Sequence, residues 1–413
     1  MENEIKNCRI CNSNKLQDFL QLGSQALTGI FPQSKHEVET YGELTLTKCE
    51  ECDLVQLRHT FPMTLMYGDN YGYRSGLNQS MVTHLKNSVE KIKSYVQLNE
   101  GDLVIDIGSN DGTLLGFYPQ DMNLKLLGVD PVGKKFKQYY LPTVNLIPEF
   151  FPSPLIQQQY GDAKAKIITS FSCFYDLEDP IQFSKDIVSR LSDDGVWVFE
   201  QSYLPMMVQT LSYDTICHEH LEYYCLKQIK FITDAAGLKI VDVIFNDVNG
   251  GSFCIVVAKN NSKIPANEKL VSEIIEKEKN DGYGDINFFK KFAADVQEHK
   301  KALIQFFDNL KKDGKKIAAL GASTKGNVVL QYCHLDTDYL MAVGEVNEFK
   351  FSRFTPGTKI PIISEAELSA MRPDYKVVLP WHFRKGFIER EKQYIEGGGK
   401  LIFALPKIEV YPG

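Results

Sequence analysis

The 413-residue sequence lacks the features that would place it in a membrane, a secreted fluid or a nucleic-acid complex. It has no continuous apolar stretch of about 18 residues, the length that a membrane-spanning helix needs. Residues 1–6 are polar and lack the apolar centre of a secretion signal. No long run of Lys and Arg occurs, and the net charge of −7 disfavours a polyanionic partner. We therefore expect a cytoplasmic protein without nucleic-acid or membrane partners.

Internal repeats and low-complexity tracts are also missing. The hydrophobic fraction of 43% and the charged fraction of 24% are those of an ordinary globular chain. Because 413 residues exceed what one hydrophobic core organises, we expect more than one domain. Changes in composition along the chain predict domains at residues 1–65, 66–260 and 261–413.

Short apolar runs alternate with helical segments in the second and third of these domains. The predicted strands of the second domain are 103–107, 126–129, 167–169 and 196–199, followed by a hairpin at 240–259. A polar helical stretch over 260–312 leads to a further unit with strands near 316–320, 341–344, 376–379 and 400–403. Strands that alternate with helices favour parallel, doubly wound sheets, so the predicted fold class is α/β.

Four of the nine cysteines form two C-x-x-C pairs near the start of the chain, Cys8 with Cys11 and Cys49 with Cys52. Thiolates at i and i+3 on a tight turn can both reach one metal ion at about 2.3 Å, and four of them make a closed tetrahedral site. We predict a structural zinc, because no ligand position stays open for chemistry. Iron, and four unrelated free cysteines, are the alternatives.

A glycine-rich turn, 106–112, follows the first strand of the second domain. Its glycines let the backbone approach a ligand closely, but the pattern is not G-x-G-x-x-G, and Asp106 and Asp111 would repel a pyrophosphate. The acidic groups suit the sulfonium and amino groups of S-adenosylmethionine. Asp130 ends the next strand, where a carboxylate can accept both ribose hydroxyls. The predicted donor-binding residues of this region are Asp106, Gly108, Asn110, Asp111, Asp130, Pro131 and Ser170.

Two of only eight histidines flank a glutamate in His218-Glu219-His220. A histidine of near-neutral pKa beside a carboxylate can remove a proton from a carbon next to a carbonyl group. In an extended segment both histidines share one face, so the spacing does not choose between them as the base. Either the second histidine or Tyr224 could donate a hydrogen bond to the resulting oxyanion. A metal site without an evident third ligand, and a polar surface turn, are the alternatives.

Polar side chains follow two further predicted strands. Gln201 and Tyr203 come after the strand 196–199, at the edge where doubly wound sheets bind ligands. Lys325 and Asn327 lie where a strand turns into a helix, so a lysine and backbone N–H groups could meet a diphosphate there. For Lys325, the alternative is a surface lysine near the start of a helix. These four residues are predicted to bind substrate.

Over nearly its whole length the sequence resembles the three-domain nucleotide-sugar C-methyltransferases of bacterial deoxysugar pathways. The resemblance rests on the paired cysteines and on motifs that occur in the family's order. These motifs are Tyr67-Gly68-Asp69-Asn70-Tyr71-Gly72-Tyr73-Arg74-Ser75, the turn at 106–115, His218-Glu219-His220-Leu221, Asn249-Gly250-Gly251-Ser252, residues 321–327 and residues 356–362.

This resemblance implies a zinc domain, a class I methyltransferase domain and a C-terminal Rossmann-like domain that helps to bind a nucleotide sugar. It implies C3 methylation of a nucleoside-diphosphate 4-keto-6-deoxy sugar, with His220 as the base and Glu219 beside it. It also implies that a lid containing Tyr71, Tyr73 and Ser75 closes over the donor.

The sequence departs from the family at Cys217, where the members carry a tyrosine. Tyr203, Tyr223 or Tyr224 could replace that tyrosine, with Tyr223 also a candidate for substrate binding. The departure leaves the identity of the sugar open. An O-methyltransferase and a non-catalytic, zinc-containing interaction protein are the alternative functions.

Overall fold

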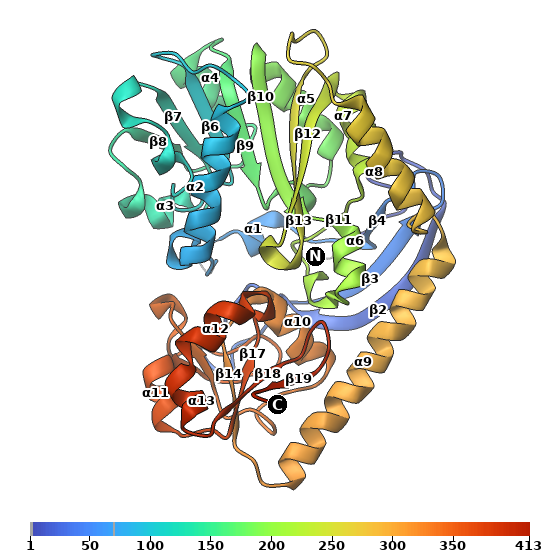
Figure 1. Cartoon of the computed structure of the whole chain (residues 1–413), viewed down its shortest axis with the longest axis vertical. Coiled ribbons are helices and arrows are strands. Elements are labelled where there is room, and N and C mark those ends of the chain that lie inside the picture. The colour runs from blue at the N-terminus through green and yellow to red at the C-terminus, as the bar shows by residue number, and fades with distance from the viewer. Residues whose placement is uncertain (1–2, 69–70) are drawn as a thin grey trace.

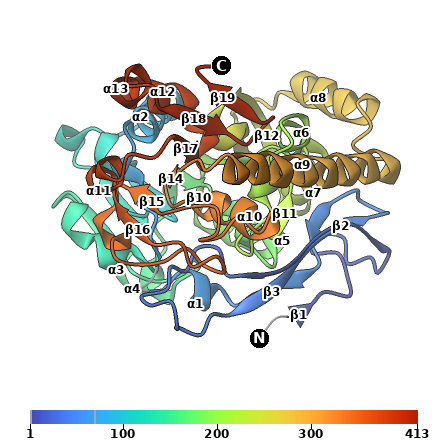
Figure 2. The same cartoon turned by 90° about the horizontal axis from the view of Figure 1, so that it is seen from below.

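A computed structural model of the chain describes residues 3–68 and 71–413, so Asp69 and Asn70 of the predicted lid lie outside the described residues. Figure 1 shows two α/β halves, one above the other. A curved N-terminal sheet and the long helix α9 (Ile286–Lys312) run along one side and connect them (Figures 1 and 2). Among the described helices, none combines the length and the apolar content that a membrane crossing needs.

The N-terminal sheet has the strand order β11-β4-β3-β2. Its strands are β2 (Leu16–Ala26), β3 (Tyr41–Cys49), β4 (Val55–Leu57) and β11 (Glu222–Tyr223). A short pair, β1 (Asn3–Glu4) and β5 (His59–Thr60), and the helix α1 (Met63–Met66) complete this part. The edge strand β11 comes from the middle of the chain and pairs with β4, with Glu222 opposite Gln56. The first sheet is therefore completed by the segment that carries the predicted base.

The upper half contains a seven-stranded sheet in the order β12-β13-β10-β9-β6-β7-β8, in which only β13 runs against the others. Its strands are β6 (Leu103–Ile107), β7 (Lys125–Val129), β8 (Val144–Ile147), β9 (Ala165–Phe171), β10 (Leu191–Ser202), β12 (Leu238–Asn246) and β13 (Ser252–Lys259). The chain enters at β6 and winds outward in both directions. The sheet order therefore reverses between β6 and β9, where ligands bind in doubly wound folds.

Helices cover both faces of this sheet, because successive strand residues point to opposite sides. Val104 packs with Leu85 and Val89 of α2 on one face, and Ile105 packs with Ile187 of α5 on the other. The helices are α2 (Gln79–Lys93), α3 (Gly133–Phe136), α4 (Pro154–Tyr160), α5 (Pro180–Arg190), α6 (Leu204–Gln209), α7 (Leu226–Ala235) and α8 (Glu268–Asn280).

The lower half contains a six-stranded sheet in the order β16-β15-β14-β17-β18-β19, parallel except for β19. Its strands are β14 (Ile317–Leu320), β15 (Val343–Glu345), β16 (Ile362–Ser364), β17 (Tyr375–Val378), β18 (Lys400–Phe403) and β19 (Glu409–Tyr411). Its helices are α10 (Thr324–Tyr332), α11 (Glu365–Ala370), α12 (Arg384–Arg390) and α13 (Lys392–Glu396). Here the order reverses between β14 and β17.

The predicted α/β fold class is confirmed, with a cysteine-bearing N-terminal part and two α/β units. The helical stretch over 260–312, which was predicted to separate the two units, is shared between them in the structure. Val271 of α8 is buried in the core of the upper sheet, whereas Phe307 of α9 is buried in the core shared with the lower sheet. Residues 268–280 therefore pack with the upper half, although they follow the predicted boundary at 260.

Candidate active site

The four predicted zinc ligands converge. The Sγ atoms of Cys8 and Cys52 are 3.5 Å apart, as are those of Cys11 and Cys49, and all four lie within 4.8 Å of one another. A tetrahedral ion with metal–sulfur bonds of about 2.3 Å requires sulfur–sulfur distances of about 3.8 Å. In each C-x-x-C knuckle, the backbone N–H of the residue after the second cysteine donates a hydrogen bond to the carbonyl of the first cysteine. These bonds run from Asn12 to Cys8 and from Asp53 to Cys49. The cluster therefore fits a structural zinc.

The glycine-rich turn lies at the carboxyl end of β6, beside the point where the sheet order reverses. Gly108 has a φ of 71° and Asn110 a φ of 51°, left-handed conformations that fold the chain sharply away from the strand. The Asn110 N–H donates to Asp130 Oδ2 at 2.7 Å, so the turn is fastened to the end of the neighbouring strand β7. The turn and the end of β7 therefore lie together at the reversal point, where doubly wound folds bind nucleosides in a crevice, and we refer to this region as the donor crevice.

Both predicted carboxylates of this crevice are buried. Asp106 is 3% and Asp130 5% exposed, and neither has an ion-pair partner among the described residues. Burial raises the pKa of Asp106 to about 7, against the opposing effect of the hydrogen bond from Thr169 Oγ1 to Oδ1 at 2.6 Å. Burial also raises the pKa of Asp130, whose Oδ1 accepts from Val132 N at 2.7 Å. Buried acidic groups without cations favour a positively charged ligand such as a sulfonium.

The predicted lid lies on the glycine-rich turn. Ser75 N donates to Asn110 Oδ1, and Gly76 N donates to Asp111 Oδ2, each at 2.9 Å. Asn110 and Asp111 thus hold the lid with their side chains. The lid also reaches the lower half, because Asn347 Nδ2 donates to the Gly72 carbonyl at 2.6 Å.

The remaining donor-site candidates occupy different positions. Tyr71 packs against Tyr67 with ring centroids 5.3 Å apart, whereas Tyr73 is 46% exposed. Pro131 begins the turn after β7. Ser170 is fully buried, and its hydroxyl accepts from Trp197 Nε1 at 2.9 Å, so this side chain is occupied within the sheet.

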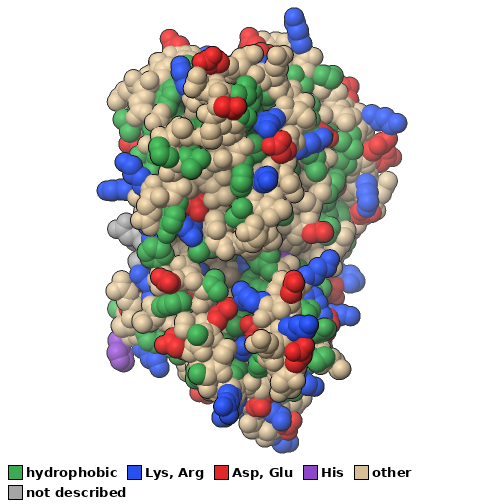
Figure 3. Space-filling view, turned by 60° about the vertical axis from the view of Figure 1, so that its left-hand side comes forward, with side chains coloured by type: hydrophobic (Ala, Val, Ile, Leu, Met, Phe, Trp, Pro, Cys, Tyr) green, Lys and Arg blue, Asp and Glu red, His purple; other side chains and the backbone are tan. Residues whose placement is uncertain are grey.

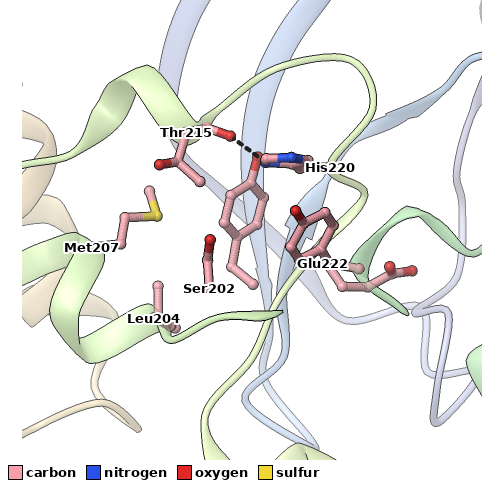
Figure 4. Close-up of a pocket in the computed structure, with 8 residues that line it drawn as sticks. Ser202, Leu204, Met207, Thr215, His220 and Glu222 are labelled. Atoms are coloured by element: carbon pink, nitrogen blue, oxygen red, sulfur yellow. Dashed lines mark hydrogen bonds between the residues drawn. The ribbon is translucent and has the colours of Figure 1, made fainter. Parts of the chain in front are cut away.

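His220 lines a small cavity between the upper half and the N-terminal sheet (Figure 4). Its Nδ1 lies 2.8 Å from the carbonyl oxygen of Thr215, and its ring packs at a tilt of 52° against Tyr175, with ring centroids 4.2 Å apart. A carbonyl can only accept, so Nδ1 carries the proton and Nε2 keeps its lone pair. Burial, together with the positive charge of Lys325, lowers the pKa of His220 to about 3. The ring is therefore neutral at pH 7, in contrast to the near-neutral pKa predicted from the sequence.

His218 points elsewhere. Residues 218 and 219 form a turn, so the extended segment assumed in the sequence prediction does not occur. His218 is fully buried, with Nε2 3.2 Å from the Gly42 carbonyl and its ring edge-on to Phe61. It does not line the cavity. This geometry separates the two histidines and gives His218 a packing position against the N-terminal sheet.

Three of the predicted tyrosines also differ in position. Tyr223 lines the cavity, and its buried hydroxyl has no hydrogen-bond partner among the described residues. Tyr224 packs on Phe174 outside the cavity, and Tyr203 donates to Glu278 Oε1 at 2.9 Å, away from it. The two latter side chains therefore do not replace the family tyrosine in this arrangement.

Two other candidates stay beside the site. Glu219 is 7% exposed and lies between the Cys217 thiol and the Thr28 hydroxyl, and burial raises its pKa. Gln201 is 1% exposed, and neither its amide oxygen nor its amide nitrogen has a hydrogen-bond partner in the described part of the chain.

The two predicted substrate-binding residues of the lower half, Lys325 and Asn327, have different surroundings. Lys325, in the first turn of α10, donates to the Asn249 carbonyl in the β12–β13 hairpin at 2.7 Å. Nearby, Trp381 Nε1 donates to Asp214 Oδ2 at 2.9 Å, so the reversal point of the lower sheet faces the β12–β13 hairpin and the segment around Asp214 in the upper half. The molecular surface is hollowed where the two halves meet (Figure 3). Asn327 instead is fully buried and donates to the Thr28 carbonyl at 2.8 Å, which makes it a contact between distant chain segments.

The cavity includes residues that the sequence analysis missed. Tyr175 lies shortly after the end of β9, at the edge of the sheet where ligands bind, and this position was a usable signal. The other lining residues come from the end of β10, from the helix and loop after it, and from β11. They are Ser202, Leu204, Met207, Thr215 and Glu222 (Figure 4).

Comparison with known proteins agrees with this geometry. Family models match residues 8–67 (zinc binding domain), 82–243 (methyltransferase domain) and 247–406 (C-methyltransferase C-terminal domain). The C-methyltransferase NovU of Streptomyces niveus is 28% identical over 98% of this chain and 97% of its own length. The tRNA U34 carboxymethyltransferase of Campylobacter lari is 30% identical, but over only 27% of this chain and 40% of its own.

Two solved structures match part of this chain with low TM-scores. A methyltransferase from Clostridium acetobutylicum that depends on S-adenosylmethionine is 15% identical, with 43% of this chain and 92% of that chain covered and a TM-score of 0.33. LepI in complex with S-adenosylmethionine is 16% identical, with 45% and 54% covered and a TM-score of 0.33.

The doubly wound sheet, its acidic crevice and the family match define an enzyme, a methyltransferase that depends on S-adenosylmethionine. The four-cysteine cluster and the matched C-terminal domain complete the assignment. In its order of matched domains, the chain is similar to the three-domain, zinc-binding C-methyltransferases.

Proposed function

We propose that this enzyme methylates C3 of a nucleoside-diphosphate 4-keto-6-deoxy sugar, with His220 as the base. The observation that carries the proposal is the fixed orientation of His220. Its Nδ1–H is held by the Thr215 carbonyl at 2.8 Å, and its neutral Nε2 is available in a cavity at the end of β10. A neutral, oriented imidazole is what removal of a proton from carbon requires.

The reaction follows from the groups around the cavity. Bound S-adenosylmethionine supplies an electrophilic methyl group, with Asp106 and Asp130 among the residues that would hold it. His220 Nε2 takes the C3 proton, and the electron pair of the C–H bond moves toward the 4-keto oxygen. The C3 carbon of the enolate then forms a bond to the methyl carbon as the methyl–sulfur bond breaks, and the ketone returns.

The hollow between the halves supports a substrate with two parts. Lys325 and Trp381 come from the reversal point of the lower sheet, and they meet the hairpin and Asp214 of the upper half. We assign the nucleotide diphosphate to this side, with Lys325 as its cation, and the keto sugar to the cavity. The unpartnered Gln201 amide and Tyr223 hydroxyl are suited to sugar hydroxyl groups, because buried polar groups are normally hydrogen-bonded.

Solvent exchange tests the base. The enzyme is incubated in deuterium oxide with thymidine-diphosphate-linked 4-keto-6-deoxyglucose and S-adenosylhomocysteine, and deuterium at C3 is followed by NMR. We expect exchange in the wild type and a loss of about 10²- to 10⁴-fold in His220→Asn, both in exchange and in kcat. The affinity for S-adenosylmethionine should remain unchanged in this variant.

His218→Asn is the matched control, and it should keep C3 exchange because His218 faces Gly42 and not the cavity. A dead His218→Asn beside an active His220→Asn would reverse the two roles. Methyl transfer to a hydroxyl group without any C3 exchange would instead establish an O-methyltransferase.

A further inference from the structure

Asp176 directly follows Tyr175, which lines the His220 cavity. It ends the short helix η5 (Phe174–Asp176), which follows β9 at the reversal point of the upper sheet. The charge of Asp176 raises the pKa of Tyr71, as does the charge of Asp130 in the donor crevice. The charge of Asp176 also raises the pKa of Tyr175, which lines the cavity. The side chain is therefore within electrostatic reach of both sites, although the residue itself is only 4% exposed.

The two carboxyl oxygens of Asp176 have unequal surroundings. Oδ2 accepts a hydrogen bond from the Tyr67 hydroxyl at 2.6 Å. Oδ1 is fully buried and has no hydrogen-bond partner among the described residues. Burial raises the pKa of Asp176 well above its usual value, and the charge of nearby Glu219 adds to this effect.

A neutral Asp176 must carry its proton on Oδ1, because Oδ2 already accepts from Tyr67. A buried O–H group without an acceptor is unfavourable, since a hydrogen-bonding group left unpaired in the interior loses its solvation. The position of Oδ1 therefore calls for an acceptor atom that arrives with a ligand. In the proposed reaction, the acceptor that develops charge is the oxygen of the enolate.

We propose that Asp176 is a neutral carboxylic acid whose Oδ1–H donates a hydrogen bond to the enolate oxygen of the substrate, with Tyr67 positioning it. This inference rests on the proposed function. No covalent bond forms at Asp176, and its proton stays with it while His220 holds the proton removed from carbon. Neutral aspartic acids beside a tyrosine stabilise enolates in the same way in an unrelated isomerase.

Two substitutions separate this role from a structural one. Asp176→Asn keeps a neutral N–H donor of the same shape, and Asp176→Leu removes the donor. We expect Asp176→Asn to retain C3 exchange within about tenfold of wild type, and Asp176→Leu to lose about 10²- to 10³-fold in exchange and kcat. The dissociation constant for S-adenosylmethionine should stay the same in both variants, which a collapsed fold would not allow.

The pH profile adds a readout that packing alone would not move. The acid form of Asp176 is active, so the wild-type rate should fall as the pH rises through its pKa, and this alkaline decline should be missing in Asp176→Asn. The infrared difference between wild type and Asp176→Asn at pH 7 should show a carboxylic acid C=O band. A carboxylate band in its place, or equally dead Asn and Leu variants, would make Asp176 an ionised group and overturn the inference.

The outcomes also distinguish this inference from the proposed function. If the wild type exchanges C3 and Asp176→Leu exchanges equally fast, Asp176 has no part in the reaction and only the inference fails. If the wild type methylates without exchanging C3, the carbon-acid chemistry fails, and the role of Asp176 fails with it.

Discussion

Arg9, which lies between the two cysteines of the first zinc knuckle, forms an ion pair with Glu222 in the wall of the His220 cavity, with Nε 3.6 Å from Oε1. Both side chains are nearly fully buried, at 3% and 0% exposure. Arg9 also donates to the Leu57 carbonyl at 2.7 Å and to Thr60 Oγ1 at 2.8 Å. The zinc knuckle is thus connected to the cavity through a single guanidinium group.

Removal of Arg9 should destabilise the protein strongly. Arg9→Met leaves the buried Glu222 without its partner, which typically costs about 3–5 kcal/mol. The double variant Arg9→Met/Glu222→Gln should recover much of this loss, because it leaves no buried charge unpaired. Urea unfolding of the zinc-loaded proteins measures the difference. Equal free energies of unfolding for the wild type and Arg9→Met would show that the pair contributes nothing.

Zinc should be bound in a ratio of one ion per chain and should be required for folding. Cys49→Ser removes one of four ligands, and the binding energy of a structural zinc is part of the folding energy. The zinc content measured by mass spectrometry and the midpoint of thermal unfolding should both fall. Cys254→Ser is the matched control, because Cys254 is a buried cysteine of β13 outside the cluster. Full stability of Cys49→Ser after chelation would contradict a structural role.

Asp130→Ala should weaken the binding of S-adenosylmethionine. Hydrogen bonds to a charged acceptor contribute about 1.5–3 kcal/mol, which corresponds to roughly tenfold to a hundredfold in the dissociation constant. Calorimetry measures this constant directly, and Asp121→Ala, at an exposed position, serves as the control. An unchanged constant would mean that the crevice holds the donor through other groups.

Lys325 should act on both the substrate and the base. Loss of its charge in Lys325→Met should raise the KM for the nucleotide sugar more than it lowers kcat, because the contact is remote from the reacting carbon. It should also raise the pKa of His220, which the Lys325 charge lowers.

The base acts when deprotonated, so the rate falls as the pH drops through its pKa. With a His220 pKa of about 3, the wild-type rate should be unaffected by His220 ionisation between about pH 5 and pH 8. In Lys325→Met, the acid limb of the pH–rate profile should lie at a higher pH than in the wild type. Single-turnover rates followed from neutral pH down through the acid limb of each protein measure the shift. A wild-type limb near pH 6.5 that disappears in His220→Asn would show that the cavity is wetter than the structure indicates.

Much of the fold followed from local patterns in the sequence. The predicted strand 103–107 coincides with β6, and 400–403 coincides with β18, because each is a buried apolar run flanked by polar residues. The edge strand β8 was missed, since its pattern of buried and partly exposed residues is short and weakly apolar. The two-residue strand β11 could not be predicted, because only its pairing with the distant strand β4 defines it.

The candidate site, like the fold, could be predicted where it depends on residues close together in the sequence. The cysteine pairs and the acidic ends of β6 and β7 are sequence-local features, and the structure brings each set together. The two histidines were placed on one face because a strand was assumed, whereas a turn at 218–219 sends them in opposite directions. The contact of Asn327 could not be predicted, because its partner, the Thr28 carbonyl, is 299 residues away and leaves no trace near it in the sequence.

The pairing of β11 with β4 constrains how such enzymes can be recombined. A chimaera that exchanges only the first 65 residues between two relatives would replace β4 and retain a foreign β11, together with the cavity residue Glu222 that it carries. It would also separate Arg9 from the glutamate with which it is paired. A functional chimaera should therefore exchange two separate segments together, the N-terminal part and the segment through Tyr223. The reason is that the folded N-terminal sheet contains residues from both parts of the sequence.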